Sequence, residues 1–414
     1  MASRLVSSLS LLAATASAFT CTAFDPVYSP ALPGGSASPP RVTKTEIFAL
    51  GRDALALSHA HEDGHAHAHG GYAHAHSNHA HMHGNHAHAH GGHAHAPSRR
   101  GGAPPALSLR PFALDAVSLA PGSLLARKAQ VNNDYVAMLD PDSLLLIFRN
   151  TAGLDNKSAA PFGGWEAPDC LLRGHFAGHW LSASAMAANA TGNATIAAHA
   201  AYVVAELLKC QQANAALYGP AAGYLSGYPA SQFDDLEALV PYPKQWSPYY
   251  SIHKIMAGLR DQHIFLGSET ALQIMEGMAS YFAVRIQNVI ARGTIALWHA
   301  IMNQEYGGMN EVLYDLFEIT GNKSYAELAS LFDKGCFLGP LALDDDDLDT
   351  MHANAHEPVV VGAARRFELF GEPAFAESAV NFQHALTTDH AYATGKWSAR
   401  SSSSTRSRLT TLPF

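Results

Sequence analysis

The sequence predicts an all-α fold, in which helical hairpins follow one another in a ring or solenoid. Of its 414 residues, 48% are apolar and 15% are charged, which suits one large globular domain or two smaller ones. After Pro104, apolar helical stretches with few β-branched runs alternate with polar segments. A glycine repeatedly closes an apolar stretch, and a polar residue then precedes the next Ala-bearing stretch.

Residues 1–18 have the pattern of a secretory signal peptide. Arg4 precedes the apolar stretch 5–14, and the small residues Ala-Ser-Ala end the segment. That stretch is shorter than the ~20 residues that span a bilayer, and no later segment is long enough, so we expect a secretory or extracellular protein without a membrane span. Phe19 also resembles the start of a plastid signal of algae with complex plastids, which leaves that organelle as the alternative.

Residues 19–105 have the composition of a low-complexity linker. The tract from His59 to His95 holds 15 of the 25 histidines, mostly alternating with alanine. The simplest interpretation is a linker made of slipped repeats. The alternative is a metal-binding or acid-sensing tail, because imidazoles gain charge together as the pH falls.

The globular part begins near residue 106. A short strand is expected around Ala116–Leu119, followed by two helices over Ala129–Leu139 and Asp142–Phe148. Two further helices, 181–190 and 200–208, are apolar nearly all round, which predicts burial between neighbours.

Glycine stops divide the rest of this region into hairpins. The last three are 54 and 50 residues apart, which corresponds to two helices plus loops for each unit. Apolar residues between the stops fall on single helical faces, as at Ile252, Ile255, Met256 and Leu259. The four glycines that we expect to end helices are Gly192, Gly267, Gly321 and Gly371.

Polar and aromatic residues concentrate in the segments that join these helices. Aromatic rings beside carboxylates and imidazoles are typical of a carbohydrate site, where rings cover the apolar face of a sugar and polar groups bind its hydroxyls. The net charge of −9 and the lack of a basic stretch argue against a nucleic-acid partner. The substrate-binding candidates are Trp165, Glu166, Tyr250, His253, Glu311, His352, Asn354 and His356.

Several candidates also have a purely structural interpretation. Glu311 could be a capping charge at the start of a helix, and Glu166 could pair with Arg173. His253 could be a core histidine with its hydrogen bonds satisfied. The pair His175 and His179 has helical spacing, but the neighbouring aromatic residues favour packing.

His352 and His356 lie in an expected loop before Pro358. Four residues apart, they could in principle share a metal ion. No third ligand is at hand, so we expect direct sugar contacts and assign no metal site.

A set of long motifs, in one order, resembles the glycoside hydrolase family 127, whose characterised members are β-L-arabinofuranosidases. The likeness covers roughly Pro111 to Gly395. It implies a catalytic (α/α)6 barrel followed by β-sandwich domains. It also implies an exo-acting enzyme that releases terminal arabinofuranose units from plant-type glycans. By this likeness, His253 is a ligand of a sugar hydroxyl. The motifs are FRNTAGL at 148, GGWE at 163, RGHFAGHWLSA at 173, PYYSIHKIMAGL at 248, EYGGMNEVLYDL at 305, HANAHEP at 352 and HAYATG at 390.

After Gly395 the sequence departs from the family pattern, and residues 396–414 form an unrelated tail rich in Ser, Thr and Arg. The resemblance places the acid/base glutamate, the zinc ligands and the cysteine nucleophile of the family downstream of this point. We therefore assign no catalytic residue, and although zinc is the family's cofactor, its ligands are absent here.

The number of hairpins leads to the same expectation. At about 50 residues for each unit, the segment 165–395 supplies between four and five hairpins, whereas a six-hairpin ring needs about six. The expected domain, 106–395, is therefore an incomplete toroid. If complete, it would be a hydrolase of terminal arabinofuranosides. The alternatives are a non-catalytic carbohydrate-binding remnant and a secreted His-rich metal-binding protein.

Overall fold

A computed structural model gives the structure of this chain. Its described part contains twelve α-helices and no β-strand, which confirms the all-α prediction. The expected signal peptide (1–18), the low-complexity segment (19–105) and the tail (396–414) lie outside the described residues. The described residues are 111–218, 223–242, 244–348 and 351–392.

Helices succeed one another along the described chain with short connections. Two 3₁₀ turns, η1 (Leu114–Ala116) and η2 (Gly164–Glu166), precede α3 and α5, and a π-helical turn, η3 (Leu386–His390), follows α14. None of the helices in the described ranges is both long and apolar enough to cross a membrane. The α-helices are α3 (Leu124–Met138), α4 (Pro141–Thr151), α5 (His175–Thr191), α6 (Ala194–Tyr218), α7 (Ser231–Glu237), α8 (Pro248–Leu266), α9 (Glu269–Ile301), α10 (Met309–Thr320), α11 (Lys323–Ser330), α12 (Gly335–Ala342), α13 (Ala353–Phe370) and α14 (Pro373–Ala385).

The predicted glycine stops are confirmed. Each glycine ends a helix in the left-handed conformation, with φ of 68°, 66°, 71° and 68° at Gly192, Gly267, Gly321 and Gly371. The polar residue after the stop caps the next helix in three cases, in which the side-chain oxygen accepts a backbone N–H. These three caps are Asn193, Ser268 and Asn322.

The fourth stop differs from the other three. Glu372 makes no capping hydrogen bond at the start of α14. Its carboxylate pairs with Arg366 of α13 at 2.8 Å instead, so it joins the two helices of the hairpin through their side chains.

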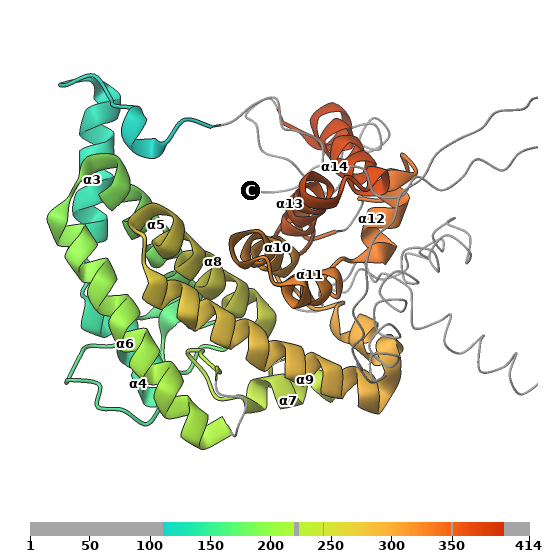
Figure 1. The fold of residues 1–414 in the computed structure, drawn as a ribbon, viewed down its shortest axis with the longest axis horizontal. Coiled ribbons are helices and arrows are strands. Elements are labelled where there is room, and N and C mark those ends of the chain that lie inside the picture. Colours follow the sequence, from blue (N-terminus) through green and yellow to red (C-terminus); the bar gives the residue numbers. More distant parts are fainter. Residues whose placement is uncertain (1–110, 219–222, 243, 349–350, 393–414) are drawn as a thin grey trace, which may run out of the picture.

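The helices form two layers. α5, α8, α10 and α13 make an inner row in which each helix contacts the next, and α6, α9, α11 and α14 are their outer hairpin partners. Figure 1 shows this succession as an arc that runs from α3 and α6 to α13 and α14. The apolar core lies between the layers and is rich in aromatic rings, among them Tyr249, Phe282, Trp298 and Phe332.

The helices of the inner row are parallel to one another. Gly178 packs against Lys254, and further along both helices the Gln262 side chain donates to the Leu181 carbonyl at 2.7 Å, so α5 and α8 run in the same direction. We call the end of the row where these four helices begin the mouth. Between α8 and α10, His253 contacts Gly307 near the start of both helices and Arg260 pairs with Asp315 further along. Between α10 and α13, Asn310 contacts Val359 and, further along, Asp315 pairs with Arg365, so these helices are parallel too.

Two glycines let α5 and α8 touch backbone to backbone. A Cβ atom on Gly178 would lie 2.2 Å from the carbonyl carbon and oxygen of Lys254. One on Gly258 would lie 2.5 Å from the Gly178 carbonyl oxygen. Since close packing leaves no room for such atoms, glycine is required at this crossing, and the crossing sets the spacing of side chains at the mouth.

A buried charge cluster attaches α4 to α6. Arg149, only 1% exposed, pairs with Asp142 at 2.8 Å and with Glu206 at 2.6 Å. Tyr202 donates to Asp142 from the same α6 face, and Lys157 lies 3.3 Å from Glu206. The guanidinium is therefore compensated on both sides, as a buried charge requires.

Two expectations about local structure are wrong. Val117 is extended, but residues 117–120 belong to no strand of the described chain, so the segment around Ala116–Leu119 is the end of a 3₁₀ turn followed by an irregular link. His352 to Pro358 is not a loop, because His352 is the N-cap of α13 and the following residues form its first turns. The expected helices 129–139 and 142–148 exist, with bounds 124–138 and 141–151.

Candidate functional site

Glu166 organises the start of α5. Its two carboxylate oxygens accept the backbone N–H groups of Gly174 and Phe176, each at 2.8 Å, and His175 Nδ1 lies 3.1 Å from Oε1. These amides have no partner inside the helix, so the carboxylate satisfies them and complements the positive end of the helix. Glu166 is 8% exposed and does not pair with Arg173. Its geometry is that of a helix cap.

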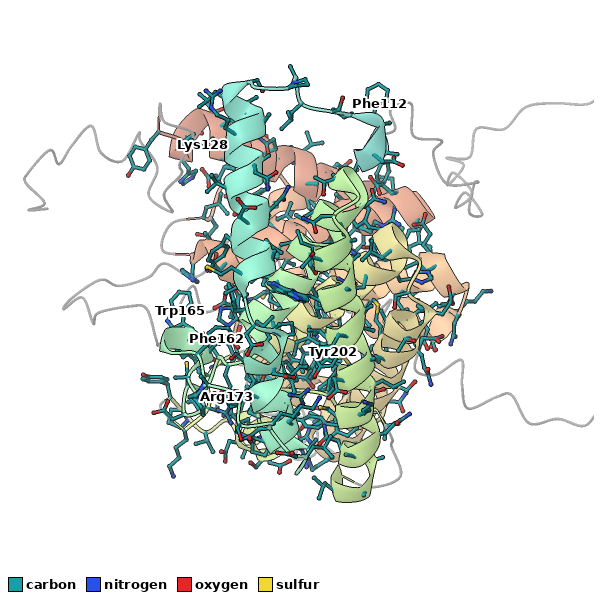
Figure 2. All side chains as sticks on the ribbon, turned by 90° about the vertical axis from the view of Figure 1, so that its left-hand side faces the viewer. Phe112, Lys128, Phe162, Trp165, Arg173 and Tyr202 are labelled. Atoms are coloured by element: carbon teal, nitrogen blue, oxygen red, sulfur yellow. The ribbon has the colours of Figure 1, made fainter. Side chains whose placement is uncertain are left out.

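Aromatic and imidazole rings gather where α5 and α8 begin. The His175 ring centroid lies 5.8 Å from that of Trp165, 6.0 Å from that of His179 and 6.0 Å from that of Tyr250. His175 is buried and packs, as we expected of both histidines, but His179 is exposed. Trp165 is 62% exposed and projects from the edge of the molecule in Figure 2. The group offers two aromatic surfaces and an accessible imidazole.

Lys254 lies over one of these rings and interacts electrostatically with two carboxylates of the mouth. The Lys254 ammonium lies 4.8 Å from the Tyr250 ring centroid, a cation–π distance. Burial lowers the pKa of Lys254, while the charges on Glu305 and Glu311 act to raise it. Although the His179 side chain is partly exposed, the protein packed around it, and next the charge on Lys254, lower its pKa to about 4, so its imidazole is neutral at pH 7.

His253 lies against the glycine pair of the next inner helix. A Cβ on Gly307 would be 2.5 Å from His253 Nδ1, and one on Gly308 would be 2.9 Å from Nε2, so only glycine permits this approach. Gly307 also has φ of +59°. Within the described part of the chain, His253 Nδ1 has no hydrogen-bond partner. The ring is therefore not a core histidine with all its hydrogen bonds satisfied.

Burial holds the pKa of His253 well below its ordinary value, and the charges of Lys254 and Arg260 add to this effect. The imidazole is therefore neutral, with one nitrogen that donates and one that accepts. Because Nδ1 is buried against Gly307, a ligand hydroxyl could reach this neutral imidazole only at Nε2.

Glu311 stands in the first turn of α10, as the alternative interpretation predicted. Its Oε1 lies 3.3 Å from Arg260 Nη1, and its Oε2 faces Gly308 beside His253. Burial raises the pKa of Glu311, although the Arg260 charge acts in the opposite direction. The carboxyl group is therefore easier to protonate than an ordinary glutamate and lies next to a neutral imidazole.

His356 and its neighbours form a second group, at the start of α13. His356 is 4% exposed, its Nδ1 lies 2.9 Å from the His352 carbonyl oxygen, and its Nε2 lies 3.3 Å from Lys334 Nζ. Burial, followed by the Lys334 charge, lowers its pKa to about 3. Both ring nitrogens are engaged, so a sugar hydroxyl would have to displace Lys334. Asn354 is exposed, and His352 is half-buried.

The structure thus gathers Trp165 and Tyr250 around His175, with Lys254 over the Tyr250 ring, and places His253 and Glu311 together beside Gly308. His352, Asn354 and His356 stand at the start of α13, where His356 contacts Lys334. Lys254 and His179 were not among the predicted residues. The i, i+4 spacing of Tyr250 with Lys254, and of His175 with His179, is the signal that could have found them.

The described residues do not fit a zinc ion. They contain no group of three His, Cys, Asp or Glu side chains arranged to hold a metal. The ring nitrogens of His356 face Lys334 and a carbonyl oxygen, and neither arrangement leaves a lone pair for a metal.

Two comparisons with known proteins complete the description. The family model described as the β-L-arabinofuranosidase, GH127 catalytic domain matches residues 116–411, which is more than half of the chain. The matched range includes most of the tail that we expected to be unrelated. A search of curated proteins finds no match.

Proposed function

This chain belongs to the GH127 family of β-L-arabinofuranosidase catalytic domains, and we propose that its mouth binds the terminal arabinofuranose ring of a plant or algal glycan for hydrolysis. The observation that carries the proposal is the group of Trp165, Tyr250, His253 and Glu311 at the start of parallel inner helices. In this group, aromatic faces lie beside neutral imidazoles and a carboxyl group.

Each part of the group has a function in binding a small, polar ring. Trp165 and Tyr250 offer π faces to the C–H face of the sugar. His253 and His179 are neutral, so they bind hydroxyls without demanding a charge on the ligand. Glu311, with its raised pKa, can donate a hydrogen bond when protonated.

Hydrolysis of a glycoside needs one group that protonates the leaving oxygen and a second that attacks or activates water. In the mouth, Glu166 is used as a helix cap and Glu311 is paired with Arg260. Glu305 is 6% exposed. Because two of these carboxylates have structural partners and the third is buried, a second candidate function is sugar binding without turnover. The experiment therefore has to separate binding from turnover.

The experiment uses the purified full-length chain. Binding of methyl β-L-arabinofuranoside is measured by ligand-observed NMR titration, and turnover is followed with an aryl β-L-arabinofuranoside, with and without added zinc. Turnover supports the hydrolase, and binding without turnover supports the second candidate. If neither binding nor turnover is detected in a folded protein, the proposal is wrong.

Trp165→Ala provides the site-specific test. Removing one aromatic face should weaken binding of the arabinofuranoside by about two- to tenfold, which corresponds to roughly 0.5–1.5 kcal/mol. The unfolding midpoint should hardly change, because the side chain is 62% exposed. Tyr135→Ala on α3, where the ring is 49% exposed, is the matched control. Equal effects of the two variants on affinity would contradict the assignment of the mouth.

A further inference from the structure

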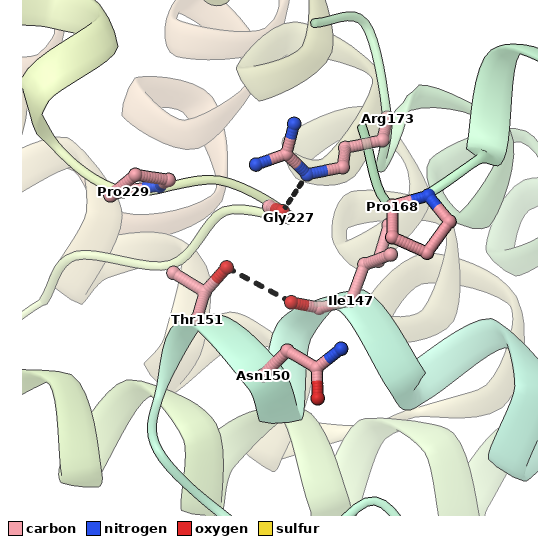
Figure 3. A pocket seen from close by; sticks show the side chains of 7 residues that line it. All are labelled: Ile147, Asn150, Thr151, Pro168, Arg173, Gly227 and Pro229. Atoms are coloured by element: carbon pink, nitrogen blue, oxygen red, sulfur yellow. Dashed lines mark hydrogen bonds between the residues drawn. The ribbon is translucent and has the colours of Figure 1, made fainter. Parts of the chain in front are cut away.

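A cavity away from the mouth lies between the last turn of α4 and the loops before α5 and α7. Its volume is about 260 Å³. In Figure 3, Arg173 and Gly227 line one side, and Ile147, Asn150 and Thr151 of α4 line the opposite side. Because pockets for drug-sized ligands measure roughly 300–1,000 Å³, this one suits a group of the size of a single sugar ring or smaller.

Arg173 is held in this cavity by neutral partners. Its Nε donates to the Gly227 carbonyl at 2.7 Å, and its Nη1 donates to the Cys170 carbonyl at 2.8 Å. The guanidinium carbon lies 5.6 Å from the Tyr228 ring centroid. No carboxylate of the described residues pairs with it, and the exposed Asp169 acts only at longer range.

The other buried or half-buried arginines of the described chain differ from Arg173. Arg149, Arg260, Arg285, Arg365 and Arg366 each pair with at least one carboxylate, and their pKa values are raised. Burial lowers the pKa of Arg173, because neutral carbonyls compensate its charge poorly. Among the described residues, its positive charge therefore has no directly paired carboxylate.

Five N–H groups project from a guanidinium, and the two carbonyls use two of them. The remaining donors are one on Nη1 and two on Nη2, which together form an edge that a planar carboxylate can bind with both oxygens. The end of α4 adds a partial negative charge of about half a unit, which is smaller than the full positive charge of the arginine. The cavity therefore keeps a net preference for an anion.

The other walls point to a sugar as the carrier of that anion. Pro168, Pro229 and Ile147 supply apolar surface for C–H groups. The Asn150 side chain is exposed at the rim, and the Thr151 hydroxyl, which donates to the Ile147 carbonyl at 2.9 Å, can still accept a hydrogen bond from a ligand hydroxyl.

We propose that this cavity binds the carboxylate of a uronic acid residue in the glycan, with Arg173 as the anion ligand and Asn150 at its rim. A single guanidinium matches the single charge of a carboxylate better than the higher charge of a phosphate. The segment 165–175 carries both Trp165 and Arg173, so it connects the cavity to the mouth along the chain. The link to a glycan rests on the proposed function, whereas anion binding at Arg173 does not.

The test leaves Arg173 in place, because its bonds to Cys170 and Gly227 hold two loops together. Asn150→Asp puts a negative charge at the rim of the cavity, where it repels an anionic ligand. Asn288→Asp, at an exposed position of α9, makes the same change of charge elsewhere. Unfolding curves of both variants should match that of the unchanged protein, which keeps the comparison valid.

The probe is methyl α-D-galacturonoside, titrated by NMR into the full-length chain, with methyl α-D-galactoside as the neutral counterpart. We expect binding of the acidic sugar alone, weakened at least about tenfold by Asn150→Asp and unchanged by Asn288→Asp. Binding should also weaken as salt is added.

Two results would overturn the proposal. The first is binding of the neutral sugar as strong as that of the acidic one. The second is no binding of the acidic sugar, whether or not sulfate binds. Because methyl β-L-arabinofuranoside is titrated separately, failure here and failure of the mouth assignment are distinguishable.

Discussion

Replacement of Gly178 by alanine tests how the α5–α8 crossing supports the mouth. The new Cβ would lie 2.2 Å from the Lys254 carbonyl group and 2.6 Å from the Ile255 nitrogen. Since both neighbours are backbone atoms, no side chain can rotate away, and the helices must separate by on the order of 1 Å. Overpacking costs about 1–3 kcal/mol or more, whereas the higher helix propensity of alanine returns about 1 kcal/mol.

We therefore expect Gly178→Ala to lower the free energy of unfolding by about 2 kcal/mol, which corresponds to a fall of about 4–8 °C in Tm. Urea unfolding followed by circular dichroism measures the first quantity directly. Gly163→Ala is the control, because no atom lies within 4 Å of the added Cβ and its φ is −94°. A Gly178→Ala protein as stable as the unchanged chain would refute the argument that backbone contact sets this crossing.

The remaining predictions concern buried charge. Burial lowers the pKa of His253 and of His356, the latter to about 3. Below pH ~6.5 the unfolded chain therefore binds more protons than the folded one. The free energy of unfolding should fall as the pH decreases from there towards the folded pKa values. Urea midpoints that stay constant from pH 7.5 to 4.5 would contradict this. Arg149→Met should cost about 1–3 kcal/mol in urea unfolding, because it removes the buried guanidinium that joins Asp142 to Glu206, whereas Glu206 keeps Lys157 and Lys209. Arg292→Met, at a surface pair with a 59% exposed arginine, should cost less than about 1 kcal/mol.

The helix stops could be predicted from sequence because their cause is local. A glycine tolerates positive φ wherever it stands, and an Asn or Ser in the next position caps the helix that follows it. The strand expected around Ala116–Leu119 had no such local cause. A strand needs a partner, and four residues of suitable composition do not reveal whether one exists.

The residues of the mouth could be predicted only in part. Tyr250 and His253 are found from their motif, but the role of Glu166 depends on amides eight and ten residues further along the chain. The fit of His253 against Gly307 joins positions 54 residues apart. Contacts of this kind follow from how the helices pack, which composition and periodicity do not specify.

The four glycine stops have a consequence for how this chain can vary. They lie at the ends of the inner helices opposite the mouth, and a Cβ at Gly192, Gly267 or Gly321 would meet no atom within 4 Å. These turns require a residue that can adopt a positive φ, but no neighbouring atom limits the size of a side chain there. Insertions or extra residues at these turns would extend into solvent without moving the helix starts that hold the rings and imidazoles. The sequence can therefore vary at the glycine turns, whereas at the mouth the close contacts between helices restrict which residues fit.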